Sequence, residues 1–459
     1  MESSNAAEAD IDGTTDAVAE PAPEPPPDTG LSASLTWPDR GPEEQLMLPG
    51  TDSVKEWESG SLRGRAVAAW QANRRALLMA VIGTAALRLI TEWVALVAQY
   101  GANFPRRIFS HPAVLLQVWS HGSAAYYLSI AQHGYAGKSV RPDQAIDGIA
   151  FAPLYPWGIH LVHTVTHLSW LASAELLSAV ATVVAIAILY RVAAAAFDQR
   201  VGDTTILVLL AFPTAFFLLA PYPDSIALVL VLLTLMAGSK GKWLLAGVLA
   251  AAATLDKYYL CLLVIVIGVE IWQHRKDRIN GGALPEVWGH ELVRVTAVIT
   301  PTLAAMGIWM AYQQVHIGNQ FAFVHAQTLQ FHRHIAPPWT MFTNVGRDLI
   351  HWRFTTAGVA GATEAVDLIT VLLLAVVTVH VFLHVRRSYG VFLGLCWCVY
   401  TFQTFLLGVT REALVLFPLF IGLGMWASRR AWRERAMLIL FLPLGYFLIA
   451  RFVTGGFAG

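Results

Sequence analysis

Long apolar runs constrain this chain most, because many of them approach the roughly 20 residues that an α-helix needs to span a bilayer. Of the 459 residues, 56% are hydrophobic and only 14% are charged, whereas about a quarter of the residues of a soluble protein are charged. Backbone in lipid must form its hydrogen bonds within helices or closed barrels. The sequence therefore predicts an all-α, polytopic integral membrane protein.

The first 60 residues have a different composition from the rest of the chain. They hold 14 acidic and two basic residues, whereas the remainder carries a net charge of +12. The segment PAPEPPPDTG is rich in proline and poor in bulky apolar residues, which predicts a disordered, acidic cytosolic tail over residues 1–65. This segment does not have the pattern of a signal peptide. It either solubilises the chain or binds a partner, and residues 75–459 form the predicted transmembrane domain.

Basic clusters set the orientation, because Lys and Arg are retained in cytoplasmic loops. Placing six such clusters inside predicts about 11 crossings, with the N-terminus cytoplasmic and the C-terminus outside the cell membrane. The predicted spans are residues 76–98, 172–194, 204–220, 224–238, 243–256, 258–272, 293–315, 367–385, 389–407, 413–427 and 436–452.

Two large extracytoplasmic loops follow from this topology, over residues 99–171 and 316–366. If residues 151–168 crossed the membrane, Arg191 and Arg200 would lie outside, against the charge rule. We therefore expect that stretch to form a short helix on the outer leaflet or dipping into it.

The first outer loop concentrates polar and aromatic side chains in a chain that is otherwise apolar. His121, Tyr126 and Tyr127 lie in the segment HGSAAYYLS. Aromatic residues of this kind usually anchor a protein at the membrane interface, but they also stack on sugar rings or line a groove for a lipid phosphate. Both interpretations remain open from spacing alone.

Two loop carboxylates, Asp143 and Asp147, are the only acidic residues between Glu92 and Glu175. Transfer of a sugar to a hydroxyl requires a group that takes the hydroxyl proton, and a carboxylate within hydrogen-bond reach can do so. A loop Asp is more commonly only solvated, so these two residues are candidates for the base and no more.

Further candidates lie at the outer ends of later helices. These are Asp224, Lys257 and Arg411, which face the same side as the two large loops. They either anchor helix ends or converge on a lipid phosphate. Arg binds phosphate through forked hydrogen bonds. His325 belongs to the second loop. The pair His332-x-His334 in that loop could chelate a divalent cation, but no further residue completes a ligand set.

Five segments carry a family resemblance. In order, they are residues 127–135 (YLSIAQHGY), 152–156 (APLYP), 212–217 with 220–222 (FPTAFF, APY), 321–327 (FAFVHAQ) and 416–420 (LFPLF). Each is weak alone, but their order over residues 75–459 resembles the bacterial PIG-V-like glycosyltransferases. Those proteins are related to the GPI mannosyltransferase 2 group of the GT-C superfold.

This resemblance implies a donor sugar carried by a polyprenyl phosphate in the outer leaflet and inversion at the sugar carbon. It also implies an Asp base just before the Tyr-Leu pair and an outer Arg before the Leu-Phe-Pro run, which Arg411 matches. The chain departs from the pattern twice. Gly122 and Ser123 stand where a Trp-Asp pair is usual, and Asp256 stands where the family tends to have an Arg.

The sequence thus predicts a GT-C-like membrane glycosyltransferase that moves a mannosyl or other hexosyl unit to an unidentified extracytoplasmic acceptor. Asp147 is the first choice of base and Asp143 the second. The predicted substrate-binding residues are His121, Ser123, Tyr126, Tyr127, Asp224, Lys257, His325 and Arg411. A divalent cation is possible, and no nucleic-acid partner is expected. The rivals are a catalytically degenerate lipid-binding or assembly protein of the same fold and, less favoured, a transporter.

Overall fold

The computed structural model describes residues 62–135, 147–281, 288–331, 334–350, 360–456 and 458. All of them belong to the second of the two units into which the chain divides, Pro42–Gly459. Within these ranges every regular element is a helix, and the only β-pairing is an isolated bridge between Ile335 and Gln403. The all-α prediction is confirmed for the described part of the chain. The predicted acidic tail lies almost wholly outside it.

Five of the described helices are long and apolar enough to cross a membrane. They are α2 (Leu62–Tyr100), α7 (Trp170–Ala196), α12 (Trp288–Ile317), α15 (Ala360–His384) and α19 (Ala431–Val453). A sixth span results if α17 (Val409–Glu412), the 3₁₀ helix η5 (Ala413–Val415) and α18 (Phe417–Ser428) count as one, although α18 is bent by 88° from the segment before it. These helices identify a multi-pass membrane protein.

Shorter helices occupy most of the other predicted spans. They are α8 (Gln199–Ala211), α9 (Asp224–Ser239), α10 (Trp243–Asp256), α11 (Leu263–Asn280) and α16 (Arg387–Thr401). One predicted span, residues 204–220, is not a continuous helix. Phe212 precedes a proline, which disfavours helical backbone, and it adopts ψ 137°. The chain therefore leaves α8 at Ala211 and continues into the 3₁₀ helix η3 (Ala215–Leu218).

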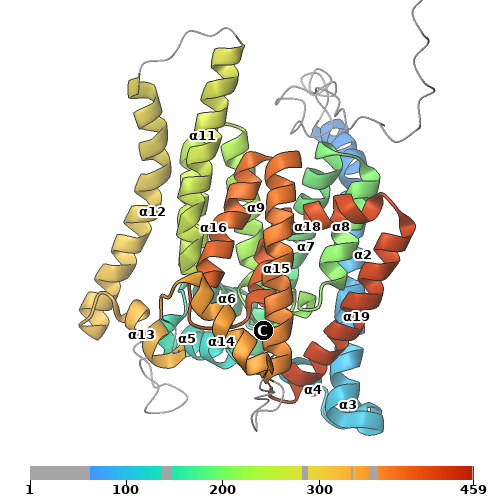
Figure 1. Ribbon diagram of the computed structural model, residues 1–459. Coiled ribbons are helices and arrows are strands. Elements are labelled where there is room, and N and C mark those ends of the chain that lie inside the picture. Colours follow the sequence, from blue (N-terminus) through green and yellow to red (C-terminus); the bar gives the residue numbers. More distant parts are fainter. Residues whose placement is uncertain are drawn as a thin grey trace, which may run out of the picture. The chain divides into compact units, whose positions relative to one another are not determined.

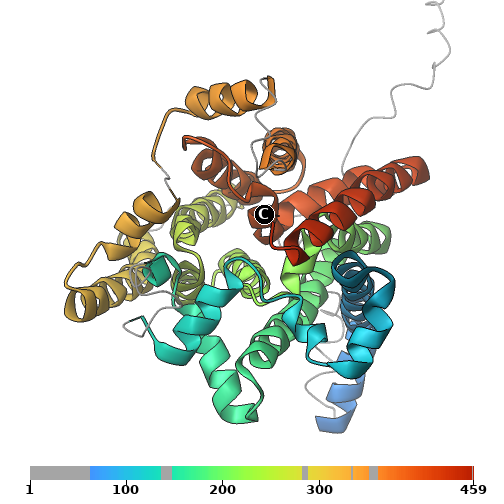
Figure 2. The ribbon, with the colours of Figure 1, turned by 90° about the horizontal axis from the view of Figure 1, so that it is seen from below.

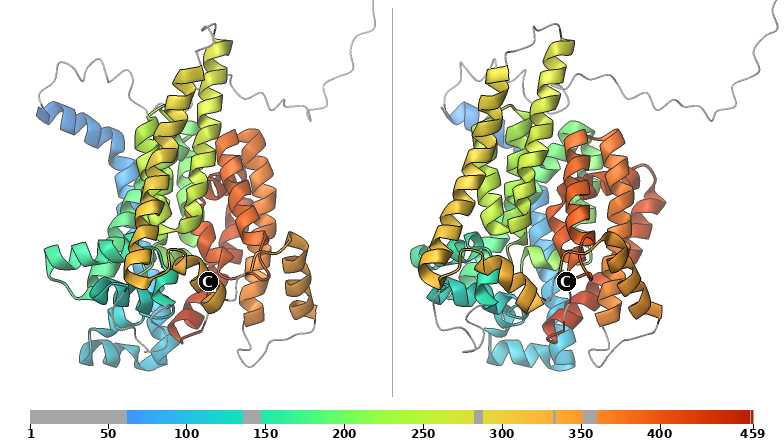
Figure 3. Two further views of the ribbon diagram at one scale, coloured as in Figure 1. Left: turned by 90° about the vertical axis from the view of Figure 1, so that its left-hand side faces the viewer. Right: turned by 60° about the vertical axis from the view of Figure 1, so that its left-hand side comes forward.

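The two large predicted loops also form short helices, and Figures 1 and 3 show α5, α6, α13 and α14 at one end of the long helices, together with the C-terminal end. The first loop contains η1 (Gly101–Asn103), α3 (Phe104–Ser110), α4 (Val114–Gln117), α5 (Ala124–His133), η2 (Asp147–Ala150) and α6 (Leu154–Thr166). The second contains α13 (Ala322–Phe331) and α14 (Pro338–Ile350). The stretch expected to form a short helix is indeed the 13-residue α6.

Small residues let the helices approach closely. Gly247 of α10 faces α12, where an added Cβ would come within 2.5 Å of the Ala297 carbonyl oxygen and 2.9 Å of Val298 Cα. Only glycine fits this crossing without moving backbone. The contact holds α10, which ends at Asp256, against α12, the helix that leads into the second loop. Figure 2 looks along the bundle from the end that carries the short helices.

Candidate functional site

A cavity of about 780 Å³ lies where the short helices meet the long ones. Its wall combines residues of the first loop (Ser123, Tyr127 and residues 150–152), of the α10–η4 junction (residues 256–259, η4 being Tyr258–Leu262), of α13, and of the segment from Val399 to Glu412. Gln327 of α13 donates a hydrogen bond of 3.0 Å to the Ala150 carbonyl, which joins the two loops across the wall. Segments far apart in sequence thus build one pocket.

The short helix α17 is held in place by a buried carboxylate. Asp367 of α15 accepts hydrogen bonds from the backbone N–H groups of Gly408 (2.9 Å) and Thr410 (2.8 Å) and from the Thr410 hydroxyl (2.7 Å). Gly408 has φ +69°, a left-handed conformation that glycine adopts without strain. This turn aims the next two side chains, Arg411 and Glu412, at the cavity.

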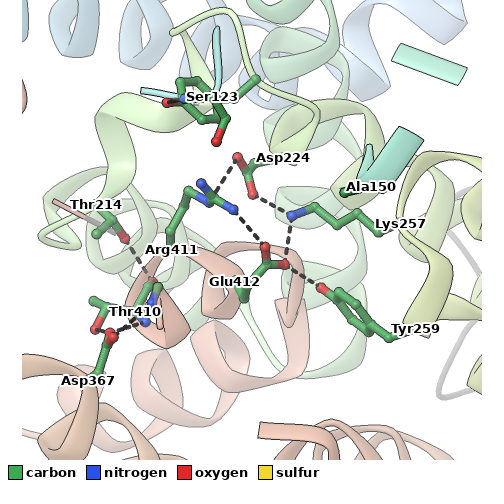
Figure 4. Close-up of polar contacts among 12 residues, drawn as sticks. Ser123, Ala150, Thr214, Asp224, Lys257, Tyr259, Asp367, Thr410, Arg411 and Glu412 are labelled. Atoms are coloured by element: carbon green, nitrogen blue, oxygen red, sulfur yellow. Dashed lines mark hydrogen bonds and ion pairs between the residues drawn. The ribbon is translucent and has the colours of Figure 1, made fainter. Parts of the chain in front are cut away.

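Four charged side chains form a network on this wall (Figure 4). Lys257 Nζ lies 2.9 Å from Asp224 Oδ1 and 2.6 Å from Glu412 Oε2. Arg411 completes the ring, because it lies 2.9 Å from Glu412 Oε1 and 3.9 Å from Asp224 Oδ2. The Tyr259 hydroxyl also donates to Glu412, at 2.8 Å. Because these groups are largely buried, opposite charges must compensate one another for the network to be stable.

Aromatic rings pack against the cationic side of the network. The Arg411 guanidinium carbon lies 5.3 Å from the centre of the Tyr222 ring and 5.5 Å from that of Phe217, distances at which the ring face attracts a cation. Tyr222 also fixes the first loop, because its hydroxyl accepts from the Ser123 N–H and donates to the His121 carbonyl, both at 3.0 Å. Gly122 permits this approach: it has φ +61°, and a Cβ there would lie 2.7 Å from the Tyr222 hydroxyl.

Asp256 differs from the other acids of the cavity wall. The residue belongs to the cavity wall but is only 3% exposed, and its two carboxylate oxygens, which have almost no accessible surface, have no hydrogen-bond partner among the described residues. A buried polar group without a partner costs about 1–3 kcal/mol. Ordinary packing therefore gives no reason for an acid at the end of α10.

Five of the predicted substrate-binding residues belong to this site. Ser123, Tyr127, Lys257 and Arg411 line the cavity, and Asp224 lies directly behind Lys257 with no exposed surface. Burial raises the pKa of Tyr127 well above its ordinary value, so its hydroxyl stays protonated and can donate a hydrogen bond.

The other three predicted substrate-binding residues are not among the lining residues. The His121 ring packs edge-on against Phe452 at 6.0 Å, and burial lowers its pKa. Tyr126 stacks on Phe151 at 5.0 Å. His325 is exposed and lies 2.9 Å from the Asn319 side chain. Their predicted contacts with the donor remain predictions.

The two predicted bases cannot be placed in the same way. Asp143 lies outside the described residues, and of Asp147 the structure describes the backbone, as the first residue of η2. Their roles remain predictions. His334 lines the cavity with an exposed side chain, whereas His332 and Arg333 lie outside the described ranges. Among the described residues, no group of three or more His, Cys, Asp or Glu side chains is arranged to hold a metal ion.

Glu412 and Tyr259 are site residues that the sequence did not single out. Glu412 accepts from three donors, Lys257, Arg411 and Tyr259. A signal for it existed, because Arg411 and Glu412 are adjacent opposite charges just before an apolar run. Asp256 was noticed only as a departure from a family pattern, since one sequence does not reveal whether a carboxylate at a helix end is paired.

One comparison with known proteins gives a match. The family model for dolichyl-phosphate-mannose-protein mannosyltransferase matches residues 150–314. This range is just over a third of the chain and includes Asp224, Asp256 and Lys257, but not Ser123 or Arg411. No curated protein and no solved structure matches. The match supports a membrane glycosyltransferase of the mannosyltransferase type.

Proposed function

We propose that this protein transfers a mannosyl or other hexosyl unit from a polyprenyl-phosphate sugar to an acceptor on the extracytoplasmic side of the cell membrane. The proposal includes the GT-C-like arrangement of about 11 crossings, with the short loop helices outside. The acceptor is a glycan, lipid or protein carrying a hydroxyl group.

The observation that carries the proposal is the composition of the cavity wall. Two cationic side chains, Lys257 and Arg411, share the wall with Tyr127, Tyr258 and Tyr259. Cations complement a phosphodiester, and aromatic faces and phenol hydroxyls suit a sugar. The 780 Å³ cavity lies within the range of typical small-molecule pockets, about 300–1,000 Å³, which accommodates a hexose, its phosphate and the first part of the lipid.

The charge network also explains how the cations are kept in place without substrate. Glu412 and Asp224 hold Lys257 between them at 2.6 and 2.9 Å. Holding the ammonium group in one position before the ligand arrives lowers the entropic cost of binding it. The rival interpretation, a catalytically degenerate lipid-binding protein, has the same cavity wall. Such a protein would bind the donor without transferring its sugar.

The test uses the full chain in proteoliposomes with radiolabelled polyprenyl-phosphate mannose. We expect saturable donor binding that is competed by polyprenyl phosphate and not by the neutral polyprenol. We also expect label to move into a mild-acid-stable product when membranes of the source cells supply the acceptor. Arg411→Gln should weaken donor binding at least tenfold.

The matched control is Arg75→Gln, an arginine whose pair with Asp203 has no part in the cavity wall. It should bind donor as the unchanged chain does. Absence of saturable binding to the unchanged chain would refute the proposed function. Binding without any transfer would favour the degenerate lipid-binding protein.

A further inference from the structure

The proposed reaction needs a proton acceptor, and among the described residues of the cavity wall Asp256 is a carboxylate without a hydrogen-bond partner. We infer that Asp256 accepts the proton of the acceptor hydroxyl, an inference that rests on the proposed function. In this step the hydroxyl oxygen forms a bond to the sugar carbon C1, and the bond from C1 to the phosphate oxygen breaks. Its electron pair leaves on the polyprenyl phosphate, and the hydroxyl proton moves to the Asp256 carboxylate.

The first argument is the state of the carboxylate. Both Asp256 oxygens lack a hydrogen-bond partner within the described part of the chain, although they are buried in the cavity wall with almost no accessible surface. A turn of the side chain into the cavity, where a substrate hydroxyl donates to one of these oxygens, would remove the cost of the unpaired group. The site therefore favours a ligand that brings a hydrogen-bond donor to this position.

The second argument is that the neighbouring acids are already engaged. Glu412 accepts hydrogen bonds from Lys257, Arg411 and Tyr259. Asp224 is fully buried behind the wall and accepts from Lys257. Hydrogen bonds and adjacent cations stabilise the charged form of a carboxylate, which makes it a poor proton acceptor. These two acids position the cations, and among the described acids of the wall Asp256 is the one without a hydrogen-bond partner.

The third argument concerns the other polar groups of the wall. The Ser123 hydroxyl does not take a proton near neutral pH. Burial keeps the Tyr127 hydroxyl protonated. His334 is the remaining candidate, but its side chain lies at the exposed edge of the cavity. It is therefore included in the test as the competing base.

The experiment compares Asp256→Asn with His334→Gln and with Asp203→Asn, an Asp that pairs with Arg75 and is not part of the cavity wall. Each full-length variant is reconstituted in proteoliposomes. Binding of radiolabelled polyprenyl-phosphate mannose is measured separately from transfer into mild-acid-stable product. General-base catalysis contributes about 10²–10⁴-fold, so Asp256→Asn should lower kcat by that factor and leave donor affinity within threefold.

A pH profile separates catalysis from structure. In the unchanged chain kcat should fall at low pH as Asp256 becomes protonated, and the residual rate of Asp256→Asn should lack this fall. Asp203→Asn should keep both the rate and the profile, and His334→Gln should keep the profile. The inference is overturned if Asp256→Asn transfers within threefold of the unchanged chain, if it loses donor binding together with transfer, or if His334→Gln alone abolishes the pH dependence. If the unchanged chain binds no donor, the proposed function itself fails, and the two failures are thereby distinguished.

Discussion

Two clusters of buried charged side chains in this protein differ in what surrounds them. In the first, Arg386 makes a forked contact with Glu270, with Nε 2.9 Å from Oε1 and a terminal nitrogen 2.5 Å from Oε2, and Ser388 also donates to Glu270. No member of this cluster lines the cavity. In the second, Lys257, Glu412 and Arg411 lie on the cavity wall with Asp224 behind them.

The difference shows that a buried ion pair is not by itself evidence of a functional site. The pair of Glu270 and Arg386 joins α11 to the start of α16. Both carboxylate oxygens of Glu270 already accept hydrogen bonds from Arg386, so a ligand is not needed to pair them. In the cavity network Glu412 has three donors, so removing Lys257 leaves two of them in place, whereas Asp224 then keeps Arg411 at 3.9 Å. We expect the first cluster to govern stability and the second to govern binding.

The largest effect should come from Arg386→Met. This change leaves Glu270, which has no exposed surface, as a buried acid without its cation. Breaking a buried pair from one side costs about 3–5 kcal/mol. The free energy of unfolding, measured by denaturant titration in detergent micelles, should fall by that amount, and the yield of folded protein should fall with it. A loss below 1 kcal/mol would show that the two clusters do not differ as argued.

A smaller loss of stability should follow Lys257→Met, which is the matched change in the second cluster. Glu412 keeps Arg411 and Tyr259 as donors, and Asp224 keeps Arg411 at 3.9 Å. The unpaired Asp224 oxygen should cost about 1–3 kcal/mol, whereas donor binding in proteoliposomes should fall at least tenfold. Equal stability losses in the two variants, with unchanged donor affinity, would contradict the assignment of the second cluster to binding.

The sequence predicted the helical elements well, because apolar runs of this length leave a membrane helix as almost the only solution. The break after Ala211 could also have been found, since Pro213 disfavours helical backbone at Phe212. The number of membrane crossings is harder to predict from the sequence. Helices such as α8, with 13 residues, are too short to be identified as spans by length and composition alone.

The site was predictable in part. Asp224, Lys257 and Arg411 were selected because they lie at outer helix ends on the side of the two large loops, and the structure brings the three together. The structure also showed which carboxylate lacks a partner, which depends on contacts between segments as distant as residues 123, 256 and 412. Spacing along one chain does not reveal such contacts, so Asp147 and Asp143 were preferred over Asp256.

The smallest effect should come from the double change Asp143→Asn and Asp147→Asn. If Asp256 takes the proton, the step does not need either of the two acids of the first loop. Transfer in proteoliposomes should stay within threefold of the unchanged chain, and the fall of kcat at low pH should persist. A 10²-fold drop in transfer with donor binding intact would indicate that an acid of the first loop is the base. The unpaired Asp256 would then be a sugar-binding residue, because a hydroxyl of the donor sugar would still give its carboxylate a hydrogen-bond partner.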